Sequence, residues 1–210
     1  MLGEPVPDWR SLRREAARSD ILRAASALAR EKGLTGWTLR DLARRLGLAA
    51  PSLYSYFASK DDLFDALFAQ GSREFLALEY PPSRDLREAM LVSARAYVRF
   101  SCDDPVRYQL LFQRTIPGFT PSAGSWALAQ QAYDKSLAGL IAFGLTEQRD
   151  LDLVTGVVSG LVAQQLANEP GGDRWTRLLE ETVDLLHEHL VRRRRRPNRS
   201  ARGTSERRPA

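Results

Sequence analysis

Side chains that donate hydrogen bonds are concentrated between residues 38 and 60, in the segment TLRDLARRLGLAAPSLYSYFASK. Arginine, lysine, serine, threonine and tyrosine contact phosphates and base edges in protein–DNA complexes. The segment is therefore a candidate nucleic-acid site. The donors that its pattern exposes are Arg40, Arg44, Arg45, Ser52, Tyr54, Ser55, Tyr56 and Lys60.

Two short helices must position these donors. Thr38 and Asp41 have the spacing of a capping box, so a helix is predicted to begin after Thr38. Gly47 follows the apolar residues of that helix and suits its C-terminal turn. Pro51 fits the first turn of a second helix, whose buried side carries Leu53 and Phe57. This arrangement predicts a helix-turn-helix, whose second helix enters a DNA major groove.

The segment resembles the TetR (tetracycline-repressor) family of one-component transcription regulators. The family pattern runs from a Thr through Ala and Leu-Gly to Leu-Tyr-x-His/Tyr-Phe and a Lys that opens the next helix. The residues that match it are Thr38, Ala43, Leu46, Gly47, Leu53, Tyr54, Tyr56, Phe57 and Lys60. The resemblance implies a sequence-specific DNA-binding transcription regulator, a repressor that a small-molecule ligand releases. It also implies a homodimer on a palindromic double-stranded DNA operator.

Individual roles follow from residue chemistry. Ala49 and Ala50 stand where many relatives carry hydrogen-bond donors, and their methyl groups suit contact with a thymine methyl group. Base readout by polar side chains then falls to Arg40, Ser52 and Ser55, with Tyr54 as a further candidate, and phosphate contacts to Thr38, Tyr56 and Lys60. The predicted DNA contacts are Thr38, Arg40, Ala49, Ala50, Pro51, Ser52, Tyr54, Ser55, Tyr56 and Lys60.

The whole chain predicts an all-α fold of about nine helices: a three-helix helix-turn-helix head followed by a helical ligand-binding and dimerisation domain. The predicted domains are residues 11–70 for DNA binding, 71–191 for ligand binding and dimerisation, and 192–210 as a disordered Arg-rich tail. Outside the helix-turn-helix, helices are expected near 11–32, 60–79, 84–102, from 105, and near 123–144, 148–168 and 173–191. Residues 115–125 hold two Pro and two Gly and are expected to form a loop.

Arginines 10, 13, 14 and 18 lie near the start of the first helix, where the helix dipole disfavours cations. They indicate a frayed arm, a nearby phosphate or a solvated basic face. The tail carries nine Arg and one Glu, and it is either a polycationic arm for nucleic acid or a solvated end.

Other chemistry has little support in the sequence. His187 and His189, the only histidines, are two residues apart and fall on different faces of a helix, so no metal site is expected. Cys102 is alone and is interpreted as a small buried hydrophobe. Phosphate-loop, dinucleotide, serine-hydrolase and zinc-protease motifs are absent, so no cofactor and no enzyme activity are expected. No apolar stretch reaches about 18 residues, and the start lacks an apolar signal core, so we expect a cytoplasmic protein without membrane contact.

Aromatic residues of the second domain suggest a pocket for an unknown small apolar or amphipathic ligand, because such sites have apolar walls with a few polar groups. The alternative is that these aromatic residues are core. The predicted pocket residues are Tyr97, Tyr108, Phe112, Trp126, Tyr133 and Gln164.

The last two helices are apolar over more surface than one partner requires, so they are predicted to pair with a second copy as a four-helix bundle. The alternative is a large monomeric core. The predicted interface residues are Val154, Val158, Leu161, Leu179, Val183 and Leu186.

Two other functions stay open. One is a DNA-binding regulator or architectural protein without a small-molecule ligand, in which Arg192–Arg196 give nonspecific affinity. The other is a helical enzyme or adaptor that shares the helix-turn-helix shape. A sharp operator palindrome would separate the ligand-responsive repressor from the first of these, and absence of DNA binding at moderate salt would favour the second.

Overall fold

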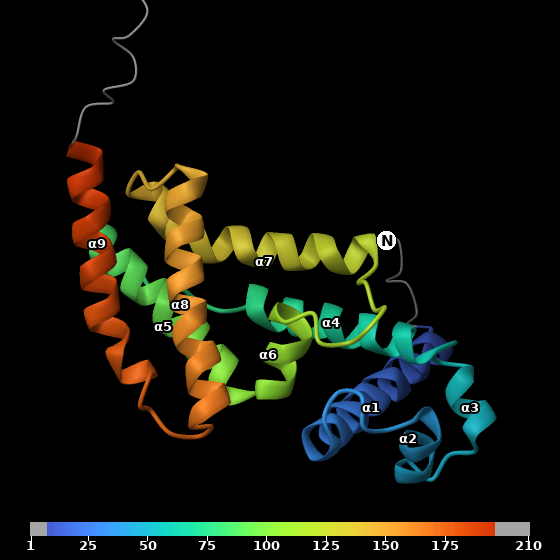
Figure 1. Cartoon of the computed structure of the whole chain (residues 1–210). Helices are drawn as coiled ribbons and strands as arrows, with labels where there is room; N and C mark the ends of the chain where they lie inside the picture. Colours follow the sequence, from blue (N-terminus) through green and yellow to red (C-terminus); the bar gives the residue numbers. More distant parts are fainter. Residues whose placement is uncertain (1–7, 196–210) are drawn as a thin grey trace, which may run out of the picture. The chain divides into compact units, whose positions relative to one another are not determined.

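The computed structural model describes residues 8–195, and these residues form α-helices without a β-strand (Figure 1). The predicted all-α fold and its helix order are confirmed. The α-helices are α1 Trp9–Lys32, α2 Leu39–Arg45, α3 Ala50–Tyr54, α4 Lys60–Leu76, α5 Leu86–Asp103, α6 Pro105–Phe112, α7 Ala123–Ala142, α8 Gln148–Asn168 and α9 Leu179–Arg195. A 3₁₀ turn, Thr176–Leu178, precedes α9.

The chain divides into two compact units, each described here by itself. Among the described residues, the first unit holds 8–79 and 99–136, and the second holds 80–98 and 137–195. By packing, α6 and the first part of α7 therefore group with the helix-turn-helix. The predicted boundary between residues 70 and 71 stays a prediction about function.

Gly71 explains the close packing of α6 against α4. A Cβ atom at Gly71 would lie 3.1 Å from Leu111 Cδ1 and 3.3 Å from Arg107 Cγ. Both distances are shorter than ordinary van der Waals contact between carbon atoms. A side chain at Gly71 would therefore require the side chains of Leu111 and Arg107 to shift.

The core of the first unit is built from apolar faces of α1 to α4. Trp37, between α1 and α2, is buried and meets the edge of Phe64 on α4, with ring centroids 6.0 Å apart. Leu53 and Phe57 bury their side chains in the same cluster, as their spacing predicted. The other principal members are Ile21, Ala25, Leu28, Leu42 and Leu63.

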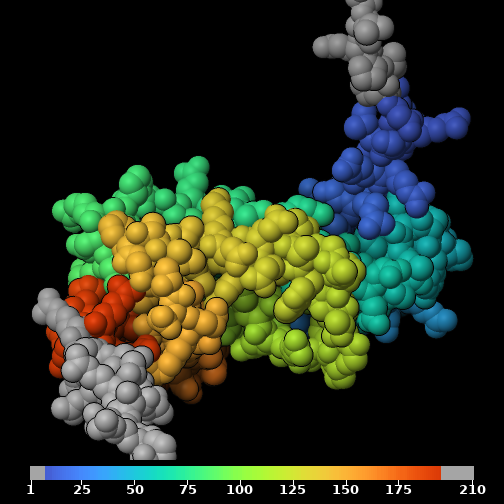
Figure 2. All heavy atoms as spheres, turned by 90° about the horizontal axis from the view of Figure 1, so that it is seen from above, coloured from blue at the N-terminus to red at the C-terminus, as the bar shows by residue number. Residues whose placement is uncertain are grey.

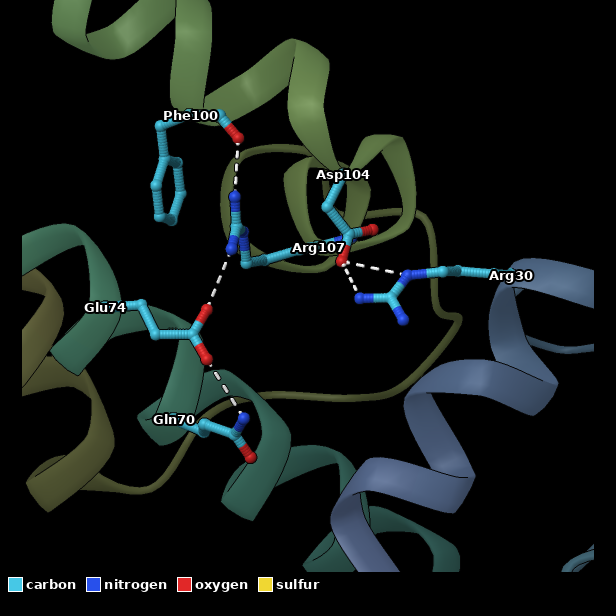
Figure 3. Close-up of polar contacts among 6 residues, drawn as sticks. All are labelled: Arg30, Gln70, Glu74, Phe100, Asp104 and Arg107. Atoms are coloured by element: carbon cyan, nitrogen blue, oxygen red, sulfur yellow. Dashed lines mark hydrogen bonds and ion pairs between the residues drawn. The ribbon is translucent and has the colours of Figure 1, made fainter.

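Polar contacts join α1, α4 and α6 around Asp104, the residue that caps α6 (Figure 3). Asp104 Oδ2 accepts from Arg30 Nη2 at 2.5 Å and Nε at 3.2 Å, while Oδ1 accepts from the Arg107 amide at 3.1 Å. Arg107 donates to Glu74 Oε2 at 2.8 Å and to the Phe100 carbonyl at 2.7 Å. The carboxylate thus holds α1 and starts α6 at the same time.

The second unit contains the packing of α8 against α9. Gln165 is buried and accepts from the amides of Trp175 and Thr176 at 2.9 and 3.3 Å. It also donates to the Glu169 carbonyl. Its side-chain amide therefore supports the connection between α8 and α9. Gly171, within this connection, has a φ of 82°.

The end of α9 differs from the sequence prediction. The helix continues to Arg195, so residues 192–195 of the predicted disordered tail are helical. Arg193 pairs with the buried carboxylate of Asp150, and Arg194 donates to the Gly144 carbonyl. These partners lie far away in the sequence, which is why composition alone did not reveal them. Residues 196–210 lie outside the described part of the chain.

The predicted dimer residues require a correction. The structure buries five of the six side chains inside this chain, and Leu161 is partly buried. They form the intrachain packing of the second unit. An apolar stripe in the sequence indicates burial, but it does not show whether the same chain or a second copy covers it. The five buried residues are Val154, Val158, Leu179, Val183 and Leu186.

Asp104 gives a stability prediction. Burial raises the pKa of its carboxyl, but the hydrogen bonds from Arg30 and the Arg107 amide outweigh burial and hold the pKa below its usual value. A depressed pKa stabilises the folded state above the unfolded pKa of about 3.9, and this contribution is lost as the pH falls through the folded value. Asp104→Asn keeps the cap but loses the ion pair, and should lower the free energy of unfolding at pH 7 by about 1–2 kcal/mol.

Asp104→Ala should lose about 1 kcal/mol more, because it also removes the α6 cap. Urea denaturation from pH 7 to pH 3 measures both variants. The gap between the wild type and Asp104→Asn should shrink below about pH 4. A gap that stays constant down to pH 3 would show that the charge of Asp104 does not stabilise the fold.

Candidate nucleic-acid interface

The helix-turn-helix is formed by α2, the turn at residues 46–49, and α3. Thr38 Oγ1 accepts from the Asp41 amide at 3.2 Å, and Asp41 Oδ2 accepts from the Thr38 amide at 2.9 Å, so the predicted capping box is present. Gly47 has a φ of 65°, which turns the chain after α2 without strain. Pro51 lies in the first turn of α3. These features confirm the predicted local structure.

The second helix of the motif, α3, has little stability of its own. It is five residues long, and its N-cap, Ala49, makes no side-chain hydrogen bond. Such short helices are marginal in water, so tertiary contacts must hold α3 in place. Leu53 and Phe57 provide the apolar contacts, since both side chains are almost fully buried.

Two arginines of α1 provide the polar contacts to α3. Arg14 Nη2 donates to the Ser55 carbonyl at 2.9 Å, and Arg18 donates to the Tyr56 carbonyl. The Arg18 guanidinium also lies over the Phe57 ring, 4.2 Å from its centroid. Carbonyl groups at a helix C-terminus lack intrahelical partners and attract cations. We call Arg14 and Arg18 the arginine pair.

The arginine pair bears on the alternatives left open for the basic start of α1. A frayed arm, a phosphate contact and a solvated face were all consistent with the sequence. The structure gives these two side chains partners within the same unit, although Arg14 is exposed. The exposed side chains of Arg10 and Arg13 have no hydrogen bond or ion pair within residues 8–195. Sequence reasoning missed this positioning role, although a spacing of four residues on one helix face was a signal for a shared contact.

Lys60 is also engaged inside the unit. Its ammonium donates to the Trp37 carbonyl at 2.5 Å and to the Thr35 carbonyl at 3.5 Å, and lies 4.4 Å from the centroid of the Trp37 ring. Burial lowers the pKa of Lys60, an effect partly offset by Asp41 and Asp61. In this structure Lys60 therefore fixes the start of α4 to the segment before α2. A phosphate contact by its remaining donor stays a prediction.

The remaining predicted contacts form an accessible surface around α2 and α3. Arg40 is exposed and has no hydrogen bond or ion pair with any residue in 8–195. By contrast, Arg44 pairs with Asp41 at 3.1 Å and Arg45 pairs with Glu31 at 2.6 Å. Of the other predicted contacts, Thr38, Ala49, Pro51, Ser52, Tyr54 and Ser55 are exposed, and Ala50 and Tyr56 are partly buried.

The predicted ligand residues are dispersed. A cavity of about 560 Å³ lies in the first unit between α4, α6, the loop 113–122 and the start of α7, and Phe112 and Trp126 line it. Figure 2 shows this loop in yellow-green beside the yellow start of α7. Tyr108 is buried behind Phe112, with ring centroids 5.8 Å apart. The lining does not include Tyr97, Tyr133 or Gln164.

Cys102 and the metal-ligating side chains do not form a second reactive site within residues 8–195. Cys102 is partly buried, and burial, helped by Asp103, raises the pKa of its thiol, which disfavours the reactive thiolate. Within residues 8–195, no three His, Cys, Asp or Glu side chains are grouped so as to hold a metal ion. The helices of the same range are too short or too polar to span a membrane.

Comparison with known proteins finds a family model that matches part of the first unit. The model of bacterial regulatory proteins of the tetR family matches residues 21–67, which span from α1 to α4. The HTH-type transcriptional repressor Rv1353c of Mycobacterium tuberculosis is 29% identical over 139 residues, or 66% of this chain and 52% of that protein. The chain thus spans about half the length of this relative. The repressor KstR2 of the same organism is 38% identical over 63 residues, or 30% of this chain and 31% of that protein.

Solved structures share the fold. A protein of unknown function from Rhodococcus sp. RHA1 has a TM-score of 0.68 at 18% identity, over 82% of this chain and 94% of that one. A TetR variant from Acinetobacter baumannii AYE in complex with minocycline has a TM-score of 0.57 at 24% identity, over 85% of this chain and 98% of that one. Such low identities establish similarity of fold alone.

Arg40 gives the sharpest prediction for this surface. Arg40→Ala should relax preference at one base pair by about 1–3 kcal/mol, because an unpaired guanidinium is available for a guanine edge. Binding to a panel of single-base-pair operator variants measures this. Arg44→Ala is the matched control, since Arg44 lies on the same helix but is paired with Asp41. An unchanged preference profile for Arg40→Ala would remove Arg40 from base readout.

Proposed function

Because this chain belongs to the TetR family of bacterial regulatory proteins, we propose that it is a sequence-specific DNA-binding transcription regulator, namely a repressor released by a small-molecule ligand. The observation that carries the proposal is the helix-turn-helix within residues 21–67. Arg14 and Lys60 donate hydrogen bonds to its backbone carbonyls or to those beside it, while most of the predicted DNA contacts on α2 and α3 stay exposed. The Mycobacterium tuberculosis relative described as a repressor supports repression, and the minocycline complex of the Acinetobacter protein supports a ligand.

The proposed mechanism separates positioning from readout. The buried side of α3 and the arginine pair fix the helix, so that Ser52, Tyr54 and Ser55 project from its other side. On α2, Arg40 is free to reach a base edge. Thr38 is exposed, but its hydroxyl donates to Asp41 Oδ2 at 2.8 Å, so its phosphate contact stays a prediction. Because little of this surface must reorganise on binding, contacts to DNA lose less conformational entropy.

We propose that a homodimer forms through the outer faces of α8 and α9, rather than through the buried stripe predicted from the sequence. Gly156 and Gly160 are exposed on α8, and a Cβ atom at either position would meet nothing within 4 Å. Val157 on α8 and Leu185 on α9 expose 37% and 63% of their surface, and Leu178, in the 3₁₀ turn before α9, exposes 37%. Small residues beside exposed apolar ones permit close helix approach by a second copy.

The architectural alternative has less support in this structure. It relied on Arg192–Arg196 as a free polycationic arm. Arg193 and Arg194 instead contact Asp150 and Gly144, and Arg192 pairs with Glu188 at 3.0 Å. These contacts leave fewer cations for nonspecific DNA binding.

Selection from a random duplex library tests the function. The wild-type chain should enrich an inverted repeat whose half-sites lie about one helical turn apart, roughly 34–36 Å, or a multiple of it. Enrichment of no sequence, with uniform salt-sensitive binding, would favour the architectural alternative. Absence of binding at moderate salt would exclude a DNA-binding function.

The same operator tests the dimer. Gly156→Arg should produce folded monomers, because arginine favours a helix more than glycine but places a charge in the contact. Binding to the full repeat should weaken by about 10²-fold or more as two-point attachment is lost. Val158→Arg is the contrasting control, since it buries a charge within the chain and should unfold the protein. Light scattering that finds Gly156→Arg dimeric would place the interface elsewhere.

A further inference from the structure

The cavity between α4, α6 and the start of α7 has the composition of a binding site for an apolar anion. Its volume of about 560 Å³ lies within the usual range of about 300–1,000 Å³ for small-molecule sites. Its walls include four aromatic side chains, from Phe68, Phe112, Phe119 and Trp126. Aromatic rings that face a cavity favour a flat apolar partner.

Two of these rings are unusually accessible. Phe112 exposes 40% of its surface and Trp126 exposes 51%, although both belong to helices that pack into the unit. The Trp126 ring lies nearly parallel to that of Phe68, at 17°, with centroids 6.3 Å apart. Exposed aromatic surface that is gathered at one cavity commonly marks a binding site rather than random surface composition.

One charge faces this apolar surface. Arg114 is the only ionisable side chain of the lining, and it is exposed without a hydrogen bond or ion pair to any residue of the described chain. Hydroxyl groups of Thr115 and Thr120 add donors on the same loop. A guanidinium without an internal partner beside aromatic walls is suited to a carboxylate, to which arginine can donate two parallel hydrogen bonds.

Hydrogen bonds join two walls of the cavity, α4 and the start of α7, in the absence of a ligand. Asp65 on α4 accepts from the Ser122 amide at 2.7 Å and from the Ser122 and Ser125 hydroxyls at 2.9 Å each. These bonds tie the start of α7 to α4 and occupy the carboxylate, which is not part of the lining. The loop 113–122 is therefore held at its α7 end, and it contributes Arg114, close to the end of α6, and Phe119 to the lining.

We propose that this cavity binds an aromatic carboxylate, with the ring system between Phe112, Phe119 and Trp126 and the carboxylate on Arg114. The inference rests on the proposed function, because it identifies the chemical class of the releasing ligand. A ligand here contacts Phe68 on α4, the helix whose first residue, Lys60, is bonded to the Trp37 carbonyl. Displacement of α4 would therefore act directly on the helix-turn-helix.

Isothermal titration of the full chain without DNA tests the site, with 1-naphthoate as the probe and 1-naphthalenemethanol as its neutral analogue. We expect 1-naphthoate to bind about tenfold or more tightly than the alcohol, and Arg114→Gln to abolish this difference. Arg99→Gln, which removes an exposed cation outside the lining, should leave it unchanged. Ala123→Phe should block both compounds by filling the cavity. Equal binding of acid and alcohol, or an acid preference that survives Arg114→Gln, would overturn the proposal.

Operator release is measured separately, by fluorescence anisotropy of a labelled duplex. Release by 1-naphthoate that is lost in Arg114→Gln supports both the site and the proposed regulation. Binding with the expected charge preference but without release supports the site and contradicts ligand-controlled repression. Release that persists in Ala123→Phe would contradict the site while leaving the proposed function intact.

Discussion

The carbonyl groups that end α3 are held by Arg14 and Arg18 of α1, and the candidate DNA surface depends on this contact. A helix of five residues without a side-chain cap cannot fix its own orientation. Burial of Leu53 and Phe57 limits where α3 lies, but apolar contacts are not directional. The two guanidinium groups add direction, because each donates to a defined carbonyl oxygen. Readout by Ser52 and Ser55 needs this directional support.

The helix α4 gathers the other constraints of the first unit. Its first residue, Lys60, fixes the segment before α2, and Asp65 fixes the start of α7. Further along, Gly71 admits α6 at close range, and Glu74 accepts from Arg107. The candidate ligand cavity and the helix-turn-helix thus share one helix, and a shared secondary element is one route by which two sites can be coupled.

Local signals in the sequence predicted local structure well. The capping box of Thr38, the turn at Gly47 and the place of Pro51 in the first turn of α3 were readable because each depends on residues at most four apart. Contacts between distant residues were not readable. The partners of Arg18 and Lys60 lie 38 and 23 residues away, so both side chains were indistinguishable from free cations in the sequence.

Apolar and polar patterns in the sequence also did not show which residues a buried side chain contacts. The stripe containing Val158 and Val183 showed that a face is buried, but periodicity does not distinguish the chain's own α9 from a second copy. Gln164 was predicted as a polar group of the pocket, but it is exposed, and it is the neighbouring Gln165 that is buried and accepts from the amides of Trp175 and Thr176. In the cavity, Phe112 and Trp126 were predictable from their aromatic side chains. Arg114 was not, because only the fold of the loop 113–122 brings it into the same lining as Phe68 on α4.

The salt dependence of operator affinity in the Arg14→Gln/Arg18→Gln double variant tests whether the arginine pair positions α3 or binds DNA. If the arginine pair positions α3, affinity should fall while the slope of log affinity against log salt stays that of the wild type. The slope reports phosphate contacts, each of which contributes about 0.9. A slope reduced by about 0.9 or more would show that these arginines bind DNA phosphates, and would contradict the account of a recognition helix held from within.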